Sequence, residues 1–80
     1  MHVQIDTILD LLNEILIIYN DYEIDETISS IRLTPSESEI KISTFVELPI
    51  ELKKELNKTF SKDYLIEFVG NMFFITRKGD

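Results

Sequence analysis

The 80-residue sequence contains no cysteine and no tryptophan, and it has only two glycines, two prolines and one histidine. Without cysteine, neither disulfide bonds nor thiolate metal ligands can reinforce the fold. Two glycines are too few for a glycine-rich phosphate-binding loop. The single histidine, His2, stands near the terminus and leaves no Ser/His/Asp or Cys/His arrangement to build. We therefore expect no enzymatic activity, no cofactor and no metal site.

Long hydrophobic runs are also missing. The longest, residues 15–19, has five residues, whereas about 20 are needed to cross a bilayer. The first ten residues carry acids rather than the basic region of a signal peptide. With 44% hydrophobic residues, the sequence predicts one small globular domain over residues 1–80, without membrane association. We expect it in the cytoplasm, or in the host cytoplasm if a phage encodes it.

Basic residues are scarce in the first part of the chain. Residues 1–47 hold ten acids but only Arg32 and Lys41, a net charge of −8, whereas residues 48–80 hold five acids and six bases, a net charge of +1. The acidic part would repel nucleic acid and attract a cationic protein surface. Acidic residues also serve solubility alone, and that interpretation stays open. We expect no direct binding of nucleic acid.

Apolar spacing predicts two helices. Over residues 3–19 the apolar residues fill about half of a helical wheel, an arc wide enough to pack on a sheet. The same residues follow heptad spacing, but over fewer heptads than a coiled coil requires. A second helix opens at Pro49, which a first turn tolerates. Its core stripe repeats every four residues: Leu48, Leu52, Leu56 and Phe60.

Alternation of polar and apolar residues predicts a first hairpin. Residues 27–34 and 39–46 have strand character and flank a turn that contains Pro35. The expected register places Leu33 near Ile40.

A second hairpin is predicted at the end of the chain. Residues 63–69 and 72–78 are joined by a two-residue turn that begins with Gly70, so Val69 should lie opposite Met72. The order αββαββ then predicts an α+β fold, a four-stranded antiparallel sheet with two helices on one face.

The acidic segment at residues 19–26, YNDYEIDE, can be tested as a calcium loop. The alternating ligand positions one, three and five would be taken by Asp21, Glu23 and Asp25. The match fails where glycine and the bidentate glutamate belong, because Glu26 and Arg32 stand there. We expect the seam between a helix and a strand; a short extra strand over residues 22–26 is an alternative.

Two surfaces are predicted to bind a protein partner. If the helices cover the other face of the last hairpin, four apolar side chains remain exposed and mark a target contact or homodimer interface: Leu65, Val69, Met72 and Phe74. The opposite assignment of the two faces stays open. The second surface is acidic and consists of Asp21, Glu23, Asp25, Glu26, Glu37 and Glu39.

These surfaces lead to a functional prediction. A small acidic protein can imitate the charges of a nucleic-acid backbone and occupy a basic groove, as inhibitors carried by phages and mobile elements do. Isoleucine occurs thirteen times and alanine never, which is typical of AT-rich genomes such as those of low-GC bacteria and their phages. We expect an inhibitor that engages a basic protein surface. The alternative is a homodimeric adaptor, chaperone or antitoxin-like partner without nucleic-acid mimicry.

Overall fold

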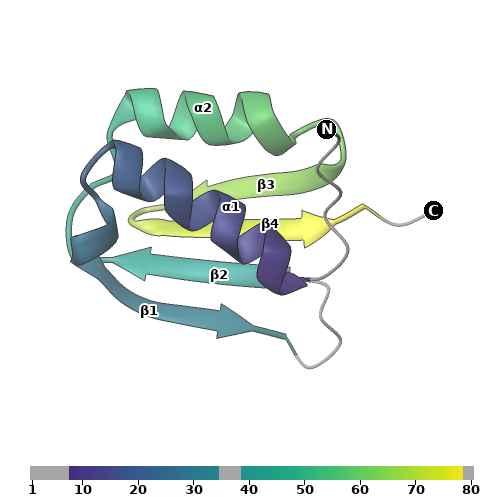
Figure 1. Cartoon of the computed structure of the whole chain (residues 1–80), viewed down its shortest axis with the longest axis horizontal. Coiled ribbons are helices and arrows are strands. Elements are labelled where there is room, and N and C mark those ends of the chain that lie inside the picture. Colours follow the sequence, from purple (N-terminus) through teal and green to yellow (C-terminus); the bar gives the residue numbers. More distant parts are fainter. Residues whose placement is uncertain (1–7, 35–38, 79–80) are drawn as a thin grey trace.

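The computed structural model describes residues 8–34 and 39–78, and its elements follow the order αββαββ (Figure 1). The two helices are α1 (Ile8–Asp21) and α2 (Ile50–Phe60), and a short 3-10 helix, η1 (Asp25–Thr27), precedes the first strand. The four strands are β1 (Ile28–Leu33), β2 (Glu39–Thr44), β3 (Tyr64–Val69) and β4 (Met72–Arg77). The predicted α+β class and element order are confirmed.

The strands form one antiparallel sheet in the order β1-β2-β4-β3. Both predicted registers are confirmed, because Leu33 pairs with Ile40 and Val69 pairs with Met72. In the turn between β3 and β4 only Gly70 has a positive φ, +59°. This is the pattern of a type II′ turn, which matches the twist of a two-stranded hairpin.

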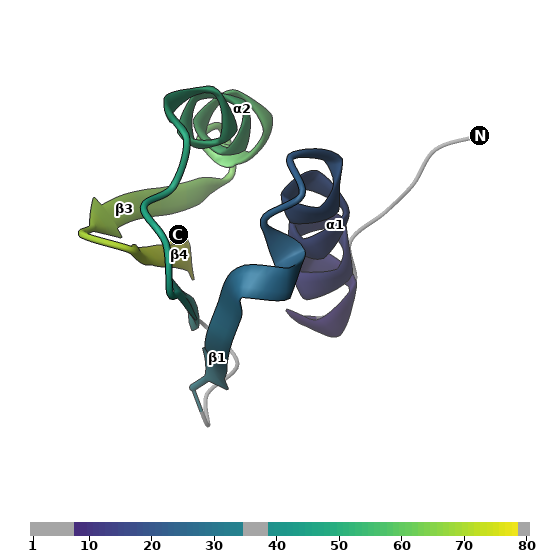
Figure 2. The same ribbon diagram turned by 90° about the vertical axis from the view of Figure 1, so that its left-hand side faces the viewer.

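Both helices lie on the same face of the sheet (Figures 1 and 2). α1 crosses the central strands, where the ring of Tyr19 lies 6.4 Å from that of Phe73 on β4. α2 lies over β3 and ends with Phe60 edge-on to Tyr64, the first residue of β3, at 6.1 Å between ring centroids. Burying aromatic rings in such tilted arrangements adds to the stability gained from the apolar area alone.

The core follows from the predicted periodicities. The stripe of α2 is buried at Leu48, Leu52, Leu56 and Phe60. From the sheet, every second residue of the central strands joins it, namely Ile40, Ile42, Phe73 and Ile75. Pro49 stands at the N-cap, one residue before the helix, and accepts a hydrogen bond from the amide of Lys53 through its carbonyl (3.1 Å).

Two details differ from the prediction. The alternative strand over residues 22–26 is wrong, since a turn and η1 occupy this segment. β2 also ends earlier than expected, at Thr44, whose side-chain hydroxyl donates to the carbonyl of Val46 at 2.7 Å. This local bond turns the chain out of the sheet, so that Phe45 and Val46 leave the strand alternation.

Candidate protein-binding surfaces

Four of the predicted acidic residues lie together where α1 passes into η1. The helix ends in a Schellman motif, with the amide of Ile24 donating to the Tyr19 carbonyl (2.9 Å) and that of Glu23 to the Asn20 carbonyl (3.0 Å). Tyr19 and Ile24 are buried beneath this turn. The motif therefore places four acidic residues around one corner of the backbone: Asp21, Glu23, Asp25 and Glu26.

Glu23 occupies a position in this corner that usually belongs to glycine. It is the only non-glycine residue of the described chain with a positive φ, 58°. A side chain in this left-handed conformation costs about 1 kcal/mol or more. The corner thus retains a carboxylate where glycine would be more stable.

The acidic surface predicted from sequence is not one surface. Glu39 begins β2, at the opposite end of the sheet from η1 (Figure 1). Its carboxylate accepts a hydrogen bond from the hydroxyl of Thr76 at 3.2 Å. Glu37 lies outside the described residues. The prediction grouped Glu39 with η1 because sequence proximity cannot show that β1 carries the chain across the whole sheet between them.

Two further acids and three apolar residues belong to the same end of the molecule as η1. The connection from β2 to α2, residues 45–49, starts next to η1, where the amide of Phe45 donates to the carbonyl of Thr27 at 2.8 Å. It then rises to α2 at the same end of the sheet (Figure 2). Phe45 is 77% exposed, the largest exposed fraction among the exposed hydrophobic residues, and Val46 and Ile50 are exposed as well. Neither of the segments 19–31 and 45–52 contains a basic residue. We call this surface the acidic end: Asp21, Glu23, Asp25, Glu26, Glu47 and Glu51 around Phe45, Val46 and Ile50.

Sequence reasoning missed the apolar part of the acidic end. The alternation predicts that Phe45 belongs to a strand over residues 39–46, and nothing in it signals that β2 stops at Thr44. Ile50 gave a usable signal, because it stands outside the four-residue stripe of Leu48 and Leu52 and so had to face away from the core.

A shallow depression of about 310 Å³ lies within the acidic end. Its lining consists of Asn20, Glu23, Asp25 and Glu26. The amide nitrogen of Asn20 donates to a carboxylate oxygen of Asp25 (3.0 Å), which leaves the Asn20 carbonyl oxygen as an acceptor. Because the lining is dominated by acceptors, its chemistry suits an ammonium or guanidinium group.

The second predicted surface lies on the face of the sheet that the helices leave uncovered, which we call the open face. The register aligns its side chains in rows across the sheet: Ser30–Ser43–Met72–Val69, Arg32–Lys41–Phe74–Glu67 and Glu39–Thr76–Leu65. The structure thus places the four predicted apolar residues on this face. Leu65 is 58% exposed and Val69 is exposed, whereas Met72 and Phe74 are half-buried.

The open face is less apolar than the sequence alone suggested, because its β1 and β2 positions are polar. Lys41 Nζ lies 5.9 Å from the ring centroid of Phe74 and covers part of that ring. Arg32 lies directly opposite Lys41 on the neighbouring strand. These are the only two bases among residues 1–47, and like charges in directly opposed positions destabilise a strand pair.

Two tyrosines tie α1 to the rest of the fold. The hydroxyl of Tyr22 donates to Glu55 Oε1 on α2 at 2.8 Å. This bond, followed by burial and the nearby carboxylates, raises the pKa of Tyr22. Burial raises the pKa of Tyr19, whose hydroxyl is enclosed without a hydrogen-bond partner among the described residues.

Within 8–34 and 39–78, no three His, Cys, Asp or Glu side chains are arranged to hold a metal ion. No helix in that part of the chain has the length and apolar character to cross a membrane.

No protein-family model matches the chain, and neither a curated protein nor a solved structure is significantly similar to it. The binding chemistry therefore has to be inferred from the side chains themselves.

Proposed function

We propose that this chain is a small protein-binding module, without catalytic activity, whose acidic end engages a basic surface of another protein. The observation that carries the proposal is the composition of that end. Six carboxylates belong to two segments, residues 19–31 and 45–52, which contain no base and which also carry the exposed side chains of Phe45 and Ile50. The nearest bases border this end on α2, where Lys54 and Lys58 line a depression with Glu51.

This combination fits a protein partner better than a small cation. An excess of carboxylates attracts a basic surface over a distance and accelerates encounter. An exposed aromatic ring supplies the apolar anchor that dominates the affinity of many interfaces. The depression beside Glu23 and Asp25 would take one lysine or arginine side chain of the partner.

The role that suits such a module is inhibition of a nucleic-acid-binding protein, of the kind carried by phages or other mobile elements. A cluster of carboxylates can occupy a groove that otherwise binds phosphates. This part of the proposal rests on charge and on analogy with other small acidic proteins. An inhibitor should compete with nucleic acid for its target, whereas an adaptor should bind without displacing it.

Capture from a lysate of the cell that carries the gene tests the proposal. The bait is compared with the variant Glu23→Gln, Asp25→Asn, Glu26→Gln and with a matched control, Glu14→Gln, Asp63→Asn, Glu67→Gln, which changes the net charge equally elsewhere. We expect a basic protein that the first variant loses and the control retains. A separate bait with Phe45→Ser should weaken the same capture.

Two results would contradict the proposal. One is a partner retained equally by both triple variants, since binding would then not depend on the acidic end. The other is a captured partner without a basic surface. If the partner depends on the acidic end but nucleic acid does not compete with the bait, the module is an adaptor rather than an inhibitor.

A second candidate is a homodimeric adaptor that uses the β3–β4 side of the open face. The exposure of Leu65 and Val69 side by side with half-buried Met72 and Phe74 favours it. Sedimentation equilibrium at high micromolar concentration tests this candidate. A dimer should dissociate in Leu65→Glu, and a monomer in the unmodified chain would exclude the homodimer.

A further inference from the structure

β1 is one of the two edge strands of the sheet, and its side chains are more exposed than those of the other edge strand, β3. β1 ends the strand order, and no other described segment pairs with its outer side. Five of its six residues are exposed. β1 contains no proline and one charge, Arg32, and its irregularity is confined to residues 28–30. Regular, unprotected edges accept further strands.

The hydrogen-bond pattern shows which peptide groups face outward. The amide of Thr34 donates to the carbonyl of Glu39 (3.1 Å), which makes this a hydrogen-bonded pair. Such pairs alternate along an antiparallel ladder, so Arg32–Lys41 is also hydrogen-bonded, whereas Ile31 and Leu33 direct both backbone groups away from β2. The outward N–H and C=O groups of these two residues lie two positions apart along β1, as the pairing of an added strand requires.

Ile31 and Leu33 also have side chains that are incompletely covered. They lie on the helix-facing side of β1 and remain 39% and 40% exposed. One side of α1 carries Leu9, Leu12 and Leu16 at helical spacing, with Leu9 exposed. Asn20, on the same side, bonds to Asp25 of η1, which leads into β1. This side of α1 therefore faces β1 and adds apolar surface next to the open edge.

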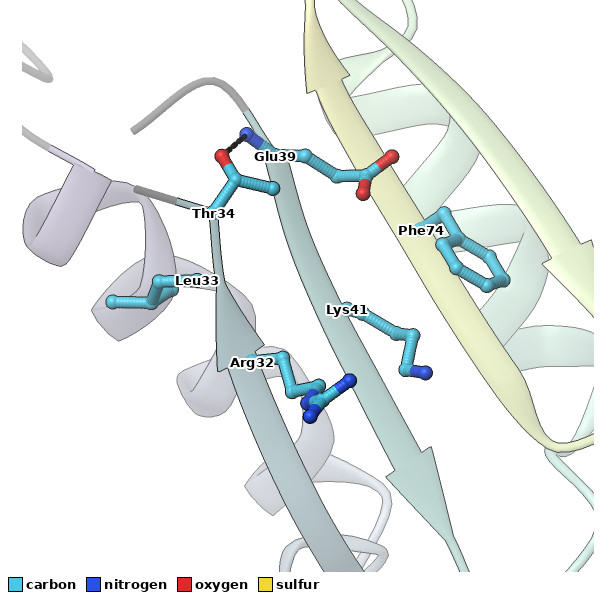
Figure 3. A pocket seen from close by; sticks show the side chains of 6 residues that line it. All are labelled: Arg32, Leu33, Thr34, Glu39, Lys41 and Phe74. Carbon is cyan, nitrogen blue, oxygen red and sulfur yellow. Dashed lines mark hydrogen bonds between the residues drawn. The ribbon is translucent and has the colours of Figure 1, made fainter. Parts of the chain in front are cut away.

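On the opposite side of β1 the charge is positive. Figure 3 shows Arg32 and Lys41 on the same side of the strands, with Phe74 beyond Lys41 and Leu33 directed the other way. With Leu33, Thr34 and Glu39 they line a shallow depression of about 500 Å³. The carboxylate of Glu39 extends toward β4 (Figure 3), where it accepts the hydroxyl of Thr76. Neither cation forms an ion pair with a carboxylate of the described residues.

We propose that the β1 edge binds an extended segment of another protein in which apolar and acidic residues alternate, so that this segment adds a fifth strand to the sheet. Its backbone pairs with Ile31 and Leu33. Its apolar side chains lie against these residues and Leu9, and its acidic side chains lie against Arg32 and Lys41. The site is separate from the acidic end and selects the opposite charge.

The same charges disfavour two other occupants. Pairing β1 with β1 of a second copy would bring Arg32, Lys41 and their two symmetry mates onto one face, with no added acid beside them. A nucleic acid would find two cations on a chain of net charge −7, and it would leave the outward amides of Ile31 and Leu33 unused.

A synthetic peptide tests the proposal on the intact chain. The probe is acetyl-GTVEIEVTG-amide, and its partner probe has lysine in place of both glutamates. We expect the glutamate peptide to bind at least tenfold more tightly by fluorescence anisotropy, and to slow hydrogen exchange of the Ile31 and Leu33 amides at least tenfold. Arg32→Glu should reverse the preference between the peptides, whereas the control Arg77→Glu should not.

Backbone pairing is tested separately by Ile31→Pro. Ile31→Pro removes an outward amide, at a position where an edge strand tolerates proline, together with the isoleucine side chain, which the control Ile31→Ala removes alone. Ile31→Pro should abolish peptide binding, whereas Ile31→Ala should only weaken it, while circular dichroism and thermal unfolding stay cooperative in both. Four results would overturn the proposal: no binding of either peptide, equal binding of both, exchange unchanged at Ile31 and Leu33, or a salt-sensitive RNA complex that displaces the peptide. A dimer that dissociates in Ile31→Pro would show that a second copy occupies the edge.

Discussion

β1 and β3 are both six-residue edge strands of the same sheet, but a helix covers only β3. Along β3 the side chains alternate between half-buried and exposed, and the ring of Phe68 stacks on Phe73 at 5.2 Å. Along β1 five residues in succession are exposed. α2 lies over β3, whereas Tyr19 anchors α1 above the central strand β4. The helical layer therefore ends before it reaches β1.

The covered side of the sheet stabilises the fold, whereas the uncovered strand β1 is free to bind a partner. The sheet is held by the side that includes α2, β3 and β4, where the rings of Phe60, Tyr64, Phe68 and Phe73 meet in pairs. β1 contributes backbone pairing but little buried area, so it can present Ile31 and Leu33 to a partner at small cost to the fold.

The largest expected difference is in the free energy of unfolding when one apolar residue on each side of the sheet is replaced by alanine. Phe60→Ala should lower the free energy of unfolding by about 3–5 kcal/mol, because it leaves a cavity under the β3 side of the sheet. Leu33→Ala should cost about 1 kcal/mol or less, because 40% of that side chain is already exposed. Urea denaturation measures both. Equal losses would mean that β1 is as much a part of the core as β3.

The next effect concerns the residue that anchors α1. Tyr19→Phe removes a buried hydroxyl that has no partner among the described residues, so it should raise the free energy of unfolding by about 1–2 kcal/mol. Exchange of the outward amides of β1 should not change, since these amides make no hydrogen bond in the sheet and exchange without unfolding. A loss of stability would show that the hydroxyl is satisfied, for example by a buried water.

The same variant has a signature at alkaline pH. Burial holds the pKa of Tyr19 in the folded state above its ordinary value of 10.0. The unfolded chain therefore releases this proton first as the pH rises, and the unmodified protein loses stability above about pH 10. Because Tyr19→Phe lacks this proton, its advantage should grow from pH 9 to pH 11. An advantage that stays constant over this interval would contradict the assigned cause.

A smaller effect is expected at the corner that leads into β1. Glu23→Gly should raise the free energy of unfolding by about 1 kcal/mol, because glycine adopts a positive φ without strain. The control Glu26→Gly removes a neighbouring carboxylate at ordinary backbone angles and should lower stability instead. Thermal unfolding checks the opposite signs. If the acidic end binds the partner, both variants should weaken that binding.

The fold was predictable because the strongest signals are local. The stripe at Leu52 and Leu56 specifies α2, and the turn at Gly70 fixes the register of the last hairpin. Alternation predicts that Leu65 and Val69 share a face, but it leaves open which face the helices cover.

The candidate surfaces were less predictable because they depend on where elements stop and lie. The early end of β2 comes from one hydrogen bond of Thr44, and it is what exposes Phe45. The separation of Glu39 from Asp25 and Glu26 comes from the course of β1 across the sheet. The hairpin register already implied that Arg32 and Lys41 lie opposite each other. That the two positive charges are available to a partner depends on the absence of a helix over that face.

The smallest expected changes in stability concern two lysines that each lie over a phenylalanine ring, one near β3 and one near β1. Lys53 Nζ is 5.7 Å from the centroid of Phe68, and Lys41 Nζ is 5.9 Å from that of Phe74. Lys53→Gln should lower stability by about 0.5 kcal/mol through loss of the cation–π contact. Lys41→Gln loses a similar contact but also removes the repulsion from Arg32, so the net change should be within about 0.3 kcal/mol of zero at low salt. In 1 M salt the repulsion is screened, and Lys41→Gln should then become destabilising while Lys53→Gln changes little. Urea denaturation at both salt concentrations measures the difference; if the two lysines respond alike, the open β1 side carries no excess of positive charge, and its proposed selectivity for acidic segments would lose its physical basis.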